Sequence, residues 1–141
     1  MARSMFLFSF VFSCSAFAGE TVLLTKTRTG SLKEACEITR TMVTKKVTSS
    51  LSPSFTVTKE TPITLSGSLE DTIQKMVVYP LASKTNMASY AAGPITTVTY
   101  TATDRVTGRA YKFAEHGAVT DLAINRPEAL VLRQLVDQLC D

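Results

Sequence analysis

The side chain best suited to acid–base chemistry is His116, the single histidine of the chain, which has Glu115 before it and Asp121 shortly after it. Its ordinary pKa is near neutrality, so it could act as a general base. A serine hydrolase also needs an activated serine, which many such enzymes carry in a Gly-x-Ser-x-Gly turn, and the sequence has no such turn. A histidine at the end of a strand is the simpler interpretation. We predict no catalytic residue and no enzymatic activity, with a hydrolase built on His116 as the third alternative.

The three cysteines are Cys14, Cys36 and Cys140. Cys14 lies in an apolar N-terminal run, which leaves two cysteines that allow one intramolecular pair. They are far apart and form no C-x-x-C motif, and no cluster of cysteines and histidines resembles a metal site. We therefore predict a structural Cys36–Cys140 disulfide, no metal and no cofactor.

Residues 1–18 have the three parts of a secretory signal peptide: Arg3, the apolar run MFLFSFVF, and the cleavage signal Ala16-Phe17-Ala18. The run is too short for a stable membrane span. A lipid anchor at Cys14 is the weaker alternative, because Phe12 and Ser13 do not fit the residues that precede such an anchor. We predict export to a periplasm or to the medium, with residues 19–141 as a single domain.

The stretch 81–94, LASKTNMASYAAGP, lacks periodicity and is long for a loop in a small domain. Methionine and tyrosine are favourable interface residues, so we predict that Lys84, Met87 and Tyr90 contact a partner protein. The formal charge of +3 comes from scattered lysines and arginines. Without a basic run or stripe, we expect no nucleic acid as a partner.

The elements that would position these residues follow from periodicity. Apolar residues at helical spacing predict a helix over Asn125–Cys140, which would be capped by Asn125, and a second helix that would be opened and capped by Ser68 and would end before Pro80. Alternation over Thr96–Phe113 predicts a hairpin that turns at Asp104–Gly108. Leu32–Thr48 is compatible with a helix, but its many β-branched residues favour strands.

These elements predict an α+β fold with a small, hairpin-rich antiparallel sheet of about four to five strands. Two helices would pack on one face of the sheet, in the order ββαββα, and a threonine-rich opposite face would contact solvent. We predict a small exported, non-catalytic protein that binds an extracellular or periplasmic protein, for instance as an enzyme inhibitor. The alternative is an envelope-associated structural protein that uses the threonine-rich face.

Overall fold

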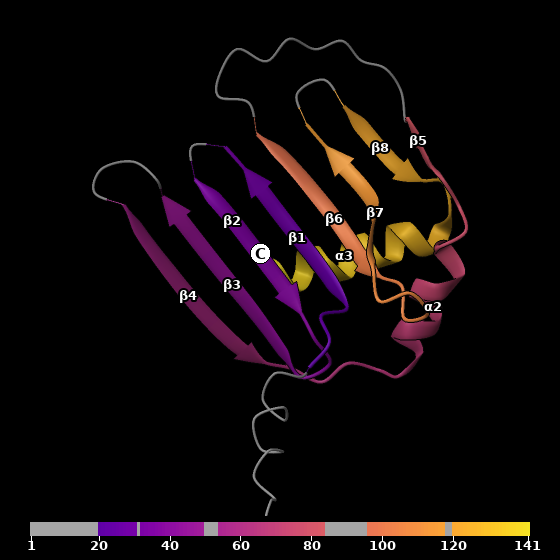
Figure 1. Ribbon diagram of the computed structural model, residues 1–141, viewed down its shortest axis with the longest axis horizontal. Helices are drawn as coiled ribbons and strands as arrows, with labels where there is room; N and C mark the ends of the chain where they lie inside the picture. Colours follow the sequence, from indigo (N-terminus) through magenta and orange to yellow (C-terminus); the bar gives the residue numbers. More distant parts are fainter. Residues whose placement is uncertain (1–19, 31, 50–53, 84–95, 118–119) are drawn as a thin grey trace, which may run out of the picture.

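Figure 1 shows the computed structural model, which describes residues 20–30, 32–49, 54–83, 96–117 and 120–141. Its strands form one antiparallel sheet of eight strands in the spatial order β4-β3-β2-β1-β6-β7-β8-β5. In chain order the elements of these residues are β1 (Leu24–Thr29), β2 (Lys33–Ile38), β3 (Met42–Ser49), β4 (Phe55–Pro62), α2 (Ser68–Met76), β5 (Leu81–Ser83), β6 (Thr97–Thr103), β7 (Ala110–His116), β8 (Asp121–Ile124) and α3 (Pro127–Cys140).

The predicted sheet of four to five strands and the order ββαββα are therefore wrong. Four strands precede α2, and four more lie between α2 and α3. The strand β5 was hard to recognise because three residues are too few for a clear alternating pattern, and β8 has only four residues. These two short strands pair with each other, and β8 also pairs with β7.

The segment 32–48 forms strands, which confirms the preferred interpretation of its β-branched residues. It makes β2 and β3, paired in antiparallel register from Lys33↔Thr48 to Ile38↔Val43. The turn between them is closed by two hydrogen bonds: the Thr39 N–H donates to the Met42 carbonyl, 2.9 Å away, and the Met42 N–H donates to Thr39 Oγ1, 3.1 Å away. The predicted hairpin of β6 and β7 is also present.

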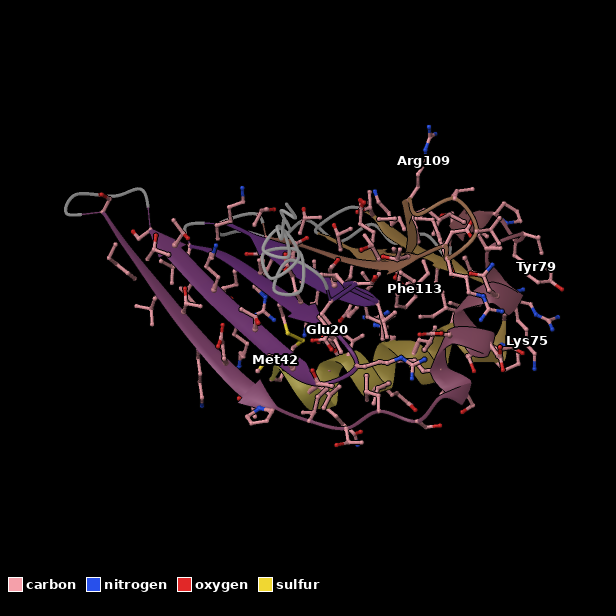
Figure 2. All side chains as sticks on the ribbon, turned by 60° about the horizontal axis from the view of Figure 1, so that its bottom comes forward. Glu20, Met42, Lys75, Tyr79, Arg109 and Phe113 are labelled. Carbon is pink, nitrogen blue, oxygen red and sulfur yellow. A yellow bond between two sulfur atoms is a disulfide. The ribbon has the colours of Figure 1, made fainter. Side chains whose placement is uncertain are left out.

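Both helices lie on the same face of the sheet, below it in Figure 2. The side chains that α2 and α3 bury include Ile73, Met76, Leu132 and Val136, which pack with Phe113 of β7 in one core. The N-cap residues are Gly67 and Arg126, so the predicted caps are each wrong by one residue, and no side-chain capping hydrogen bond forms at either helix. Helix stability here comes from packing of the apolar stripe.

The sheet face opposite the helices is rich in threonine. Across the central strands β1 and β6 the threonines stand directly opposite one another, in the pairs Thr25↔Thr101, Thr27↔Thr99 and Thr29↔Thr97. The alternate residues of β1, Leu24 and Lys26, are buried on the helix face. The hydroxyls of Thr25 and Thr101 are hydrogen-bonded to each other.

The outer strand β4 is paired only with β3, and all eight of its residues are exposed. Lys59, Glu60 and the terminal Pro62 discourage further strand pairing at this edge. In the part of the chain that the structure describes, no helix has the length and apolar character needed to cross a bilayer.

Candidate functional site

One row of directly opposed residues crosses the whole sheet on its helix-facing side. From β4 to β5 the row consists of Lys59, Lys45, Cys36, Lys26, Tyr100, Ala114, Ala123 and Ala82. Helix α3 passes across the strands on this side (Figure 1). We call residues 134–140 of α3 its closed half, because they lie over large side chains of the row, and residues 127–133 its open half, because they face the three alanines.

The closed half is bonded covalently to the sheet. The sulfur atoms of Cys36 and Cys140 are 2.02 Å apart and the Cα atoms 6.0 Å apart, which confirms the predicted pair as a disulfide. The bond lies between the sheet and the last turn of α3, as the yellow bond in Figure 2 shows. Its partners are separated by 104 residues, so it joins an early strand to the end of the chain.

A partly buried charge cluster lies beside the disulfide. Lys26 is only 7% exposed, and its Nζ donates to Asp137 Oδ1 and to Asp141 Oδ1, both at 2.8 Å. The Tyr100 hydroxyl donates to the same Asp137 oxygen at 2.7 Å. Each polar atom that is withdrawn from water here has a partner, so the cluster fixes the helix without leaving a bare buried charge.

These contacts determine the protonation of the cluster. Burial by itself would lower the pKa of Lys26, but the hydrogen bonds to Asp137 and Asp141 outweigh it and raise this pKa above its ordinary value. Burial would likewise raise the pKa of Asp137, but the hydrogen bonds from Lys26 and Tyr100 hold it below its ordinary value. The ammonium and the carboxylate are therefore both charged at neutral pH.

The open half of α3 leaves a cleft. Ala114, Ala123 and Ala82 stand in register on β7, β8 and β5, and Ala129 of α3 faces them across the gap. Four methyl groups cannot fill the distance between a helix and a sheet, and a volume of about 550 Å³ remains. We call this the alanine cleft. The described residues that line it are Ala82, Ser83, Ala114, Ala123, Ile124, Asn125, Arg126, Pro127, Ala129, Leu130 and Arg133.

Two arginines are the charged residues among those that line the alanine cleft in the described part of the chain. The Arg126 guanidinium lies 4.8 Å from the centre of the Tyr79 ring, and that of Arg133 lies 5.0 Å from the centre of the Tyr100 ring. Stacking on an aromatic ring holds a long side chain in place. An apolar floor with a few oriented polar groups is typical of a small-molecule site, and the volume lies within the usual range of about 300–1,000 Å³.

The partner-binding residues predicted from the sequence, Lys84, Met87 and Tyr90, lie outside the described residues, so that prediction stays a prediction. His116 ends β7 and is 59% exposed, with its Nδ1 3.7 Å from Asp121 Oδ1. Within the described segments, Asp121 is therefore the acidic residue that His116 contacts. No group of three or more potential metal ligands occurs among the same residues.

Sequence reasoning missed the alanine cleft. Its floor comes from three strands, one of them only three residues long, and alanines carry no signal of a site by themselves. Arg126 and Arg133 fall two turns apart on one side of α3, which was a visible signal. What they face could not be known without the order of the strands.

Comparison with protein-family models gave no match, and neither did comparison with curated proteins or with solved structures.

Proposed function

We propose that this chain is a small exported binding protein without catalytic activity, and that its ligand occupies the alanine cleft. The observation that carries the proposal is the cleft itself, an apolar volume of about 550 Å³ whose two charged lining residues are oriented by aromatic rings. Export is supported by the signal-peptide pattern of residues 1–18. The Cys36–Cys140 disulfide is compatible with an oxidising compartment.

Support for a binding role over catalysis comes from the chemistry at the cleft. Its described lining residues include no carboxylate, histidine or cysteine, the side chains that most often transfer protons or attack a substrate. His116, the candidate base, is exposed and contacts Asp121. The described lining of the cleft can hold and orient a molecule.

The experiment that tests this proposal is native mass spectrometry of the oxidised exported chain after incubation with the small-molecule fraction of a culture extract. We expect a bound mass on the wild-type protein that is lost in Ala123→Phe, because the phenyl ring would occupy the cleft. Val131→Phe is the matched control. Val131 is 58% exposed on α3, so this variant adds the same bulk outside the cleft.

A bound mass that survives in Ala123→Phe, or that disappears equally in Val131→Phe, would contradict the cleft as the site. Circular dichroism of both variants establishes that the fold is retained. Absence of any bound mass on the wild-type protein across extracts of the producing cells and their medium would contradict the binding role.

The inhibitor version of this proposal adds a protein partner contacted by Lys84, Met87 and Tyr90. Ser83, the last residue of β5, lines the alanine cleft, so the segment that carries these residues starts at the cleft in sequence. Replacing Met87 and Tyr90 by alanine is expected to abolish capture of such a partner while the bound small molecule is kept. Unchanged capture would remove these residues from the proposal.

A second candidate function is attachment to the cell envelope through the threonine-rich face. The specific observation in its favour is the set of paired threonines on the central strands β1 and β6. Neighbouring strands are about 4.8 Å apart and alternate residues about 7 Å apart, so hydroxyls recur at regular intervals that suit a repeating polymer.

The envelope function predicts that the protein sediments with purified cell-wall material and that Thr27→Val/Thr99→Val reduces this retention several-fold. Thr61→Val is the control, because Thr61 pairs with the buried Val43 and so belongs to the helix-facing side of the sheet. Full recovery of the wild-type protein in the soluble fraction would count against this function.

A further inference from the structure

We propose that the ligand of the alanine cleft is an amphipathic anion, in which a carboxylate or phosphate head group binds Arg126 and Arg133 and a single apolar chain lies on the alanines. This inference rests on the proposed function and gives its ligand a chemical class. The source we commit to is a free amphiphile in solution.

The charge of the alanine cleft determines the head group of the ligand. In the described part of its lining, the charged side chains are both cationic, and no carboxylate balances them within the cleft. The ion pair of Arg126 is a loose one, with its Nε 3.5 Å from Glu128 Oε1. Arg133 forms no ion pair shorter than 4 Å with a described residue, although its charge acts on the carboxylate of Asp137, which also binds Lys26 and Tyr100. Both guanidinium groups keep donors for an incoming anion.

The arginines are oriented before any ligand binds. Arg126 stacks on Tyr79, which follows α2, and Arg133 stacks on Tyr100 of β6. Figure 2 shows Tyr79 at the end of the molecule where α2 and the start of α3 lie. An arginine held by an aromatic ring loses little further freedom when it binds a planar or tetrahedral anion, so more of the interaction energy contributes to affinity.

The floor of the alanine cleft determines the apolar part of the ligand. Ala82, Ala123 and the exposed Leu130 present apolar surface to the cleft, and its buried lining residues Ala114 and Ile124 are apolar as well. A hydrocarbon chain on this surface would release water from both partners, which favours binding. A fully polar anion would leave this part of the cleft wet, and an apolar cation would meet two positive charges. An amphipathic anion satisfies both ends of the cleft.

The test is isothermal titration of the oxidised protein with decanoate, and with decyltrimethylammonium as a probe of equal chain length and opposite charge. We expect decanoate to bind and the cation not to bind. Arg126→Gln and Arg133→Gln should each weaken decanoate binding about tenfold, as expected for the loss of a hydrogen bond to a charged group. Ala123→Phe should abolish it.

Arg109→Gln is the matched control. Arg109 extends away from the helices into solvent (Figure 2), so its loss lowers the net charge by the same amount without touching the cleft. Equal weakening in Arg109→Gln would mean that long-range charge alone attracts the probe, and it would overturn the proposed contacts. Equal binding of decanoate and decyltrimethylammonium would overturn the anionic class.

The outcomes also separate this inference from the proposed function on which it rests. Native mass spectrometry could find a ligand on the wild-type protein that is absent from the Ala123→Phe variant, while decanoate does not bind. In that case the cleft is a binding site, and its assignment to amphipathic anions is wrong. Decanoate binding that persists in Ala123→Phe would place the probe elsewhere and overturn the inference. Binding to vesicles of anionic phospholipid without binding of free decanoate would overturn the free amphiphile as the source.

Discussion

The two halves of α3 lie over the same row of the sheet and meet it in opposite ways. The closed half is held by a disulfide to Cys36 and by the Lys26–Asp137–Tyr100 cluster, and its space is filled. The open half passes over Ala114, Ala123 and Ala82, and the side chains between helix and sheet leave a cleft there. One helix therefore has an anchored end and an end that is free to serve as the wall of a site.

This difference indicates that the two halves of α3 have different roles. Ala129 and Leu132 pack the open half into the core, but it must also stay in place beside an unfilled space, and filling that space with side chains would remove the site. Fixing the far end of the same helix by a covalent bond and a charge cluster solves this, because a helix of 14 residues transmits its position along its length.

The largest expected effect is on the anchored end. Replacing Cys36 and Cys140 by alanine should lower the free energy of unfolding by up to about 4–5 kcal/mol, because a loop of this length loses its covalent closure in the unfolded state. Urea denaturation of the wild-type and double-variant proteins measures the change. An unchanged unfolding midpoint would mean that the closed half does not depend on the bond.

The charge cluster should have the next largest effect. Lys26→Met keeps the length of the side chain but removes the partner of Asp137 and Asp141, and we expect a loss of about 2 kcal/mol in the free energy of unfolding. Lys75→Met is the control, since Lys75 is exposed on α2 and its replacement should change stability by less than about 0.5 kcal/mol. Equal effects of the two variants would contradict a structural role for the cluster.

A pair of alanine substitutions compares filled and empty space directly. Ala102→Leu places three more carbon atoms into the filled core, where Ala102 is 1% exposed, and should cost about 1–3 kcal/mol. Ala123→Leu extends into the alanine cleft and should leave stability within about 0.5 kcal/mol of wild type or raise it, because no atom has to move. Thermal unfolding of both variants checks this. A similar cost at both positions would show that the cleft is not open.

The smallest expected effect concerns pH. The pKa of Asp137 is held below its ordinary value of 3.8, so its contribution to stability is present above that value and is lost as the pH falls through the lowered pKa. Wild-type stability should decrease from about pH 4 to pH 2, and Asp137→Asn should show a weaker decrease. Asp71→Asn, at an exposed position of α2, is the control and should keep the wild-type slope.

The sequence by itself determined the disulfide, the strands β2 and β3, the hairpin of β6 and β7, and the two helices. Each of these depends on local periodicity or, for the cysteines, on the single pairing that two residues allow. Periodicity is a property of neighbouring residues, so it can be read without the fold. The caps were each misplaced by one residue, because the packing of the apolar stripe determines where a helix begins more strongly than an available side-chain cap does.

Only the tertiary structure decided the rest. The number of strands was wrong in part because β5 is defined by its pairing with β8 and not by an alternating pattern of its own. The alanine cleft depends on three residues that are adjacent only because β7, β8 and β5 are neighbours in register. In the sequence they are separated by many residues and look like ordinary strand alanines. Small side chains create a site only where a helix lies above them, and the position of α3 is a property of the assembled sheet.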